Sequence, residues 1–100
     1  MTRQEILEKA KACVCGEREQ DYGSPEDSFA AIADHWSVYL HRIGYLLPHQ
    51  ELTPEDVALM MILLKVARQT GRGKVDNWID IAGYAACGGE IATGGEHAEV

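Results

Sequence analysis

Apolar residues recur at helical spacing in four stretches of the chain, and polar helix-start signals precede them. Thr2 and Glu5 have the spacing of a capping box, and Ser24 and Thr53 each stand directly before a proline. No stretch alternates apolar and polar residues as a half-buried strand does. The pattern therefore predicts an all-α protein. The expected helices span residues 3–15, 25–44, 54–70 and 76–87, within a single helical domain over residues 1–88.

The end of the chain has a different composition. Gly88 and Gly89 are expected to break the last helix, and the residues after them are rich in glycine and glutamate. We therefore expect residues 89–100 to form a flexible acidic tail.

The predicted helix 54–70 contains an uninterrupted apolar run from Val57 to Leu64. A helix that is apolar on every side is buried on every side, and a bundle of this size cannot surround one of its own helices. We therefore expect a homo-oligomer in which this helix, together with helix 76–87, lies at the subunit interface. Met61 and Leu64 are expected to be buried there. The alternative is a packed monomer that exposes a few Met and Leu side chains.

Composition narrows the range of partners. The chain has 9 Lys and Arg against 16 Asp and Glu, and its net charge is −7. No basic patch is available to displace counterions, which argues against nucleic acid and anionic membranes as partners. The apolar run from Val57 to Leu64 is far shorter than the ~20 residues that span a bilayer.

The number of cysteines and the polarity of the first residues both favour a protein of the cytoplasm. The first residues are polar and lack the apolar segment of a signal peptide. Cys13, Cys15 and Cys87 are an odd number, which favours free thiols in a reducing compartment. A zinc site built from these three residues would need a fourth ligand.

Acidic residues inside the apolar helix 76–87 are candidates for chemistry. Asp76 and Asp80 are four residues apart and share one face of this helix, to which Asn77 also contributes. Carboxylate and amide oxygens suit Mg²⁺ or Mn²⁺. The alternative makes Asp76 a helix N-cap and Asp80 the ion-pair partner of Lys65 or Arg68.

Lys65 and Arg68 lie three residues apart at the end of the apolar run. They are placed either to neutralise the carboxylates of helix 76–87 or to bind a polyphosphate. The alternative is an ordinary basic helix C-terminus that the helix dipole favours.

Two other regions carry polar residues that a ligand site would use. Asp27 belongs to a polar stripe along helix 25–44, for which a solvated face is a sufficient explanation. In the preceding loop, Tyr22 is a candidate for stacking on a base and Arg18 for contacting phosphate, although a turn and a helix cap explain most of this segment.

The chain resembles a family of phage-encoded domains of unknown function. Four segments carry the resemblance: YGSPEDSF at residues 22–29, IADHW at 32–36, LTPEDVALMMILLKVAR at 52–68 and DNWIDIAGYAA at 76–86. That family in turn resembles the MazG-like nucleotide pyrophosphohydrolases, including the dATP/dGTP diphosphohydrolases. The resemblance implies a MazG-like four-helix bundle that forms a homodimer or homotetramer. It also implies Mg²⁺-dependent cleavage of nucleoside triphosphates to monophosphate and pyrophosphate.

Only part of the MazG-like metal motif can be transferred to this chain. Asp80 matches the aspartate that closes the second acidic pair of the family, whereas Asn77 stands in place of its glutamate. Helix 54–70 has no ExxE motif. Its nearest acids are Glu55 and Asp56, at its start.

These observations lead to one functional hypothesis and two alternatives. The hypothesis is a phage-type pyrophosphohydrolase of the host cytoplasm that acts on purine (deoxy)nucleotides. The alternatives are a nucleotide-binding protein that sequesters its ligand without cleaving it, and a purely structural oligomer. In the hypothesis Asp80 and Asp76 hold Mg²⁺ with help from Asn77, Asp27 or Asp56, Lys65 and Arg68 offset phosphate charge, and Tyr22 and Trp36 pack the base.

Overall fold

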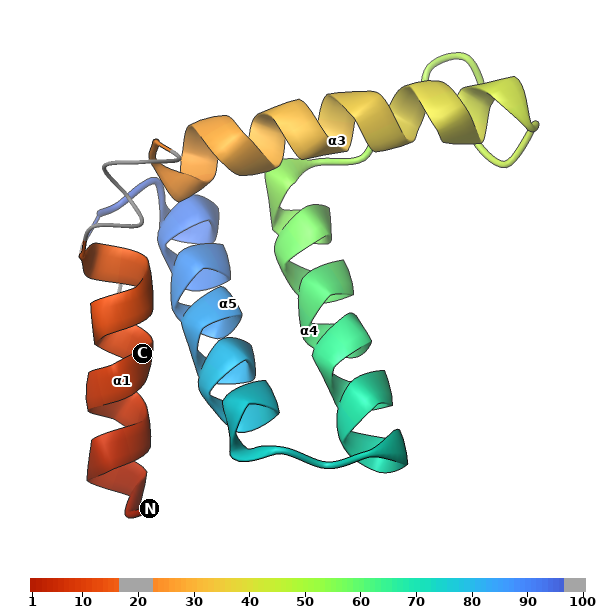
Figure 1. Cartoon of the computed structure of the whole chain (residues 1–100). Helices are drawn as coiled ribbons and strands as arrows, with labels where there is room; N and C mark the ends of the chain where they lie inside the picture. Colours follow the sequence, from red (N-terminus) through yellow and green to blue (C-terminus); the bar gives the residue numbers. More distant parts are fainter. Residues whose placement is uncertain (17–22, 97–100) are drawn as a thin grey trace.

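The computed structural model describes residues 1–16 and 23–96, and these residues form four α-helices and no strand. The predicted all-α class is confirmed. The helices are α1 (Arg3–Cys15), α3 (Pro25–Arg42), α4 (Pro54–Gly71) and α5 (Val75–Thr93), as Figure 1 shows.

Local hydrogen bonds fix the starts of the first three helices. The Thr2 and Thr53 hydroxyls accept bonds from backbone N–H groups three residues ahead, and the Ser24 hydroxyl does the same for α3. In α4 the arrangement is reciprocal, because the carboxylate of Asp56 accepts the Thr53 N–H at 2.9 Å. These caps satisfy N–H groups that a helix start leaves without partners.

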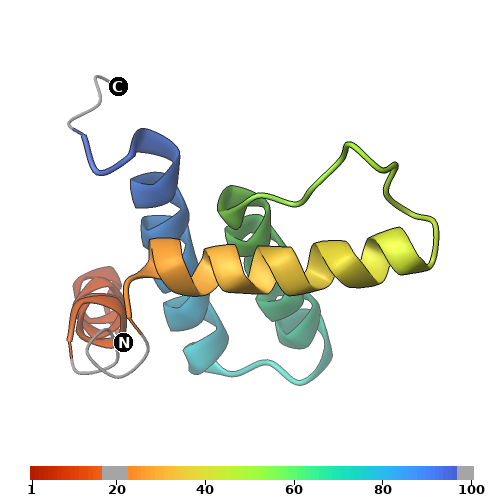
Figure 2. The ribbon, with the colours of Figure 1, turned by 90° about the horizontal axis from the view of Figure 1, so that it is seen from above.

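α5 is the centre of the arrangement, because it packs against α4 on one side and against α1 on the other. α3 lies across the ends of α5 and α4, with α1 to one side of its start, and its C-terminal part extends beyond α4 (Figures 1 and 2). We call this projecting part, residues 38–52, the arm. The radius of gyration is 14.9 Å, whereas a compact chain of this length has about 13 Å. The chain is therefore more open than a closed bundle.

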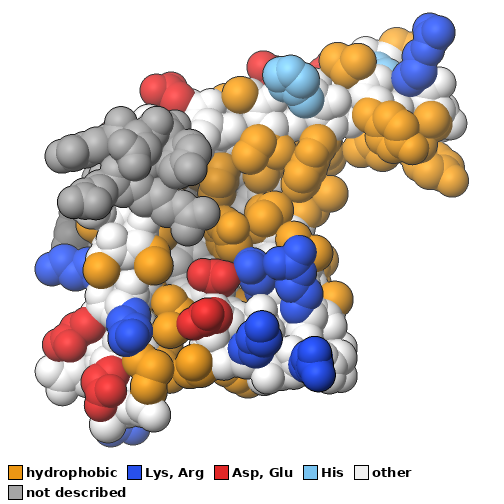
Figure 3. Space-filling view, in the orientation of Figure 1, with side chains coloured by type: hydrophobic (Ala, Val, Ile, Leu, Met, Phe, Trp, Pro, Cys, Tyr) orange, Lys and Arg blue, Asp and Glu red, His pale blue; other side chains and the backbone are white. Residues whose placement is uncertain are grey.

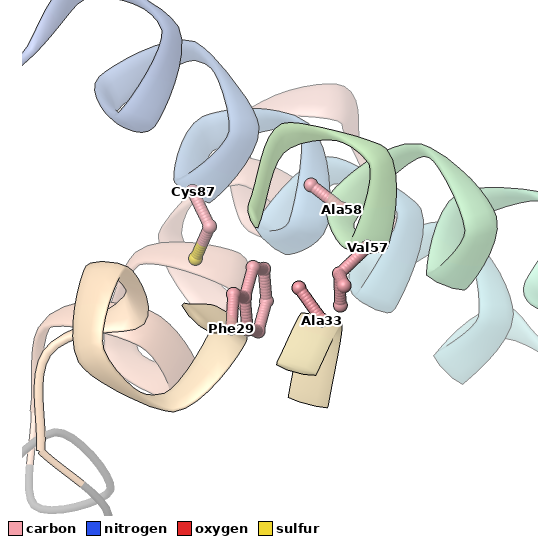
Figure 4. Packing of buried hydrophobic residues seen from close by; sticks show 5 residues of the cluster. All are labelled: Phe29, Ala33, Val57, Ala58 and Cys87. Carbon is pink, nitrogen blue, oxygen red and sulfur yellow. The ribbon is translucent and has the colours of Figure 1, made fainter. Parts of the chain in front are cut away.

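The hydrophobic core is small and lies where α3 crosses α4 and α5. Figure 4 shows its five buried members: Phe29, Ala33, Val57, Ala58 and Cys87. Two of them are alanines, which let the helices approach closely. Trp36 and Met61 are partly buried and pack against this cluster.

α5 ends later than the sequence predicted. Gly88 and Gly89 lie inside the helix, which continues to Thr93 and ends at Gly94 with φ of 65°. Packing explains the difference, since a Cβ at position 88 would lie 3.0 Å from the Cβ of Ala58. A glycine is therefore used here for close helix contact rather than as a helix end. The end of α3 also differs from the prediction, because α3 ends at Arg42, two residues before its predicted end.

α4 buries one face only. Val57 and Ala58 are buried, and Met61 is half-buried, whereas Leu59 and Leu63 are 55% and 64% exposed. The expectation that α4 is covered on every side is therefore not met within one chain. No helix in residues 1–16 and 23–96 has the length and apolar content of a membrane span.

Candidate functional site

An ion pair connects the middle of α4 to the middle of α5. The Lys65 Nζ atom lies 2.9 Å from Asp80 Oδ2, and the two side chains are 14% and 30% exposed. Of the two ion-pair partners that the sequence offered for Asp80, the structure selects Lys65. Arg68 is exposed one turn further along α4. Figure 3 shows Lys and Arg side chains over α4 beside Asp and Glu side chains over α5, so both charges share one face.

A second polar contact ties the start of α5 to the end of α4. Gln69 Oε1 accepts hydrogen bonds from Asn77 Nδ2 and from the backbone N–H of Lys74, both at 3.1 Å. Asn77 is only 7% exposed, so its amide needs such a partner. This bond gives Asn77 a structural role between the two helices, although the sequence offered it as a metal or substrate ligand.

Asp80 also reaches the wall of a hollow on the other side of α5. This hollow has a volume of about 280 Å³ and lies between α1, the start of α3 and α5. The rings of Phe29 and Tyr84 lie against one another in its wall, with centroids 6.2 Å apart and planes tilted by 40°. Its lining includes three residues with polar side chains: Ser28, Tyr84 and Asp80. The remaining lining residues are Cys13, Val14, Gly23, Pro25, Ile32, Ile79, Gly83 and Cys87.

The shape and lining of the hollow limit what it can hold. Ligand pockets usually have about 300–1,000 Å³, so this one suits a single ring system rather than a whole nucleotide. Aromatic and aliphatic walls favour a flat apolar face. Among the described residues Asp80 is the one charged residue of the lining, and an ionised carboxylate accepts hydrogen bonds from ring N–H or amino groups.

The four carboxylates predicted to hold a metal are not brought together in one chain. Asp27 and Asp76 are exposed in the first turns of α3 and α5, and the Asp56 carboxylate caps α4. In the described part of the chain, no three His, Cys, Asp or Glu side chains form a group that could hold a metal ion. The described residues of one chain therefore do not fit a carboxylate site for Mg²⁺ or Mn²⁺.

The N-cap role considered for Asp76 is wrong. α5 begins at Val75, so Lys74 occupies the N-cap position, and no side chain caps this helix. Asp76 lies in the first turn, where its charge is favourable to the helix dipole.

The remaining predicted ligand residues lie elsewhere. Trp36 packs against the core and does not line the hollow. Arg18 and Tyr22 fall outside the described residues. Sequence reasoning missed Ser28, Cys13 and Cys87 as lining residues. Each stands on an apolar helix face, where a small residue is indistinguishable from a core residue.

Comparisons with known proteins place the chain among phage domains. A family model described as "Domain of unknown function (DUF6378)" matches residues 5–92. The chain is 44% identical over 81 residues to the Gene 55 protein of Mycobacterium phage L5, a match that covers 80% of this chain and 47% of that protein. It is 42% identical over 83 residues to the Gene 55 protein of Mycobacterium phage D29, covering 82% of this chain and 50% of that protein. The chain thus spans about half the length of the curated relatives it matches. No solved structure matches it significantly.

Proposed function

This chain belongs to the DUF6378 domain family, and we propose that it binds a nucleotide, with the base in the hollow beside Asp80 and the phosphates at the cations of α4. The observation that carries the proposal is the hollow itself. It offers aromatic and aliphatic walls for a ring, and a carboxylate at its edge for the amino and ring N–H groups of a base.

The charge distribution along the chain supports a phosphate position on α4. The chain as a whole is acidic, but between Asp56 and Asp76 it carries Lys65, Arg68, Arg72 and Lys74 and no acid. Lys65 is joined through its ion pair to the residue that reaches the hollow. Arg68 stands one turn from Lys65 and is exposed, so its guanidinium is accessible to a phosphate.

Hydrolysis of a nucleoside triphosphate to monophosphate and pyrophosphate is our second candidate function. It is supported by the MazG-like pattern around Asp80 and by the position of that residue at the hollow. Among residues 1–16 and 23–96 of one chain the carboxylates do not form a metal group, and this favours binding without turnover. Catalysis would require carboxylates from outside the described residues of one chain.

The same proposal includes a MazG-like bundle and self-association. The exposed apolar side chains of α4 support a homodimer or homotetramer, because a single chain leaves them in water. The phage relatives support action in the host cytoplasm, where nucleotides are abundant, and so do the thiols of Cys13, Cys15 and Cys87, which form no disulfide in the described structure. A purely structural oligomer remains the alternative if no nucleotide binds.

One experiment separates these functions. The protein is titrated calorimetrically with ribo- and deoxyribonucleoside mono-, di- and triphosphates, once with Mg²⁺ and once with EDTA, and each mixture is then separated by anion exchange. Binding without products supports sequestration, products support hydrolysis, and neither result supports the structural oligomer. For the binding protein we expect a measurable affinity in both buffers.

Matched variants locate the ligand. Ser28→Leu fills the hollow and should abolish binding, whereas Ala31→Leu adds the same side chain to an exposed position of α3 and should not. Arg68→Ala should weaken the affinity for triphosphates more than for nucleosides. Arg3→Ala removes an exposed cation from α1 and serves as its control. Unchanged affinity in Ser28→Leu would refute the placement of the base.

A further inference from the structure

The side of α4 that faces away from α5 is apolar and exposed. The ion pair of Lys65 marks the side that faces α5. On the opposite side, helical spacing places Leu59, Leu63 and Val66 in one stripe, at i, i+4 and i+7. Met60 and Leu64 form an adjacent row. All five side chains are exposed.

The arm adds a second apolar surface at an angle to the first. Figure 1 shows that it overhangs α4 on the side away from α5. Its return segment is held against α3, since the Leu52 N–H donates to the buried Ser37 hydroxyl at 2.8 Å. Within the segment, the Leu47 N–H donates to Gln50 Oε1 at 2.9 Å. The arm also exposes Val38, but the residues that we assign to this surface are Tyr39, Ile43, Tyr45 and Leu47, which are exposed as well.

The two surfaces lie on either side of the angle between α3 and α4. In Figure 3, hydrophobic side chains continue from the arm into the angle between α3 and α4. We call the following nine residues the corner surface: Tyr39, Ile43, Tyr45, Leu47, Leu59, Met60, Leu63, Leu64 and Val66. Their exposed fractions correspond to an area on the order of 900 Å², when each is scaled to its full residue area. The largest apolar patch of a typical monomer is about 300–600 Å², and a stable interface buries about 800 Å² on each partner.

We propose that the corner surface binds a second copy of this chain, with the arm of each copy in the angle between α3 and α4 of the other. A two-fold arrangement of this kind uses the same surface twice, which suits a shape that has both a projection and a recess. Homodimer interfaces are more apolar than those of transient complexes, and the number of exposed apolar side chains on α4 and the arm suits such an interface. The proposal specifies the interface of the oligomer proposed above and does not depend on nucleotide binding.

The test measures molar mass in solution for variants of both surfaces. Leu63→Glu places a charge on the α4 part of the corner surface, and Tyr45→Glu places one on the arm, where the tyrosine is 78% exposed. Leu7→Glu is the control, because Leu7 lies on α1 and is 62% exposed, nearly as much as Leu63. Light scattering across a concentration series should give at least twice 11.0 kDa for the native chain and for Leu7→Glu. Both corner variants should give the monomer mass, with a dissociation constant raised at least about 100-fold, because an unpaired charge is costly in an apolar interface.

Each other result overturns a distinct part of the proposal. If the native chain is monomeric at high micromolar concentration, self-association is refuted. The corner surface would then bind a different partner. Corner variants that stay oligomeric refute this surface but not the oligomer. Dissociation by Leu63→Glu alone removes the arm from the interface. Circular dichroism melts verify folding, and Leu63→Ser and Tyr45→Ser replace any variant that unfolds. Nucleotide affinity is measured on the same samples, so a failure of the ligand proposal is seen separately.

Discussion

Replacing Asp80 with Asn tests whether the Lys65–Asp80 pair stabilises the fold. The change keeps the size of the side chain but removes the charge that faces Lys65 Nζ at 2.9 Å. The Lys65 side chain is 14% exposed, so water cannot fully solvate the cation that remains. Breaking a fully buried pair costs about 3–5 kcal/mol, and an exposed pair contributes about 0–1 kcal/mol. For this partly exposed pair we expect a loss of about 2 kcal/mol.

The expected loss is large enough to measure by thermal and urea unfolding. A domain of this size loses about 4–8 °C of Tm per kcal/mol, so the Tm of Asp80→Asn should fall by roughly 8–16 °C. All samples must have the same protein concentration, because self-association raises Tm. Asp76→Asn is the control. It removes an exposed carboxylate one turn earlier on α5, and should cost less than about 1 kcal/mol.

A double variant shows where the loss comes from. Lys65→Met with Asp80→Asn removes the stranded cation, so it should be more stable than Asp80→Asn alone. If Asp80→Asn costs no more than Asp76→Asn, the pair has no stabilising role and the reasoning is refuted. If Asp80→Asn keeps its Tm but loses Mg²⁺-dependent turnover, the carboxylate acts in hydrolysis instead.

Three further outcomes follow from the same contacts. Gln69→Ala should destabilise the chain by about 1–3 kcal/mol, because it strands the buried amide of Asn77, while Gln4→Ala on the exposed side of α1 should change unfolding by less than about 0.5 kcal/mol. Thr53→Ala should cost about 1 kcal/mol in urea unfolding by removing the α4 cap, and Thr53→Ser should restore it. Calorimetry should give the same nucleotide affinity in Mg²⁺ and in EDTA, and a dependence on Mg²⁺ would contradict the metal-free site.

The starts of α1, α3 and α4 were predictable because capping is local. Thr2, Ser24 and Thr53 act on residues three positions ahead, so the sequence contains the whole interaction. The end of α5 depends on a distant residue instead. Gly88 is helical because Ala58 of another helix lies against it, and no window of local sequence contains that contact. The rule that glycine ends a helix therefore predicted an end at Gly88, although α5 continues through this residue where it packs against α4.

The apolar run of α4 predicts that apolar side chains are exposed, but it does not predict which face of the helix exposes them. It correctly indicated that α4 has more apolar surface than one chain covers, yet it did not separate the faces. Met61 and Leu64 were both predicted to be interface residues. Met61 packs against the core instead, whereas Leu64 is exposed and belongs to the corner surface. The direction in which α5 approaches α4 decides this, and that direction is a tertiary property.

The alternatives for Asp80 differed only in what stands opposite the carboxylate. Spacing along α5 places Asp76 and Asp80 on one face, but it does not say which side chain of α4 meets them. Lys65 has the length to reach Asp80 across the interface, and its ammonium group pairs with one of the two carboxylate oxygens, Oδ2. The hollow depends on tertiary geometry in the same way. A Cβ at Gly83 would lie 3.1 Å from Val14, so α1 and α5 are in close contact there, and the start of α3 supplies the rest of the lining. The hollow is lined by residues of three helices, so no spacing rule within one helix could predict it.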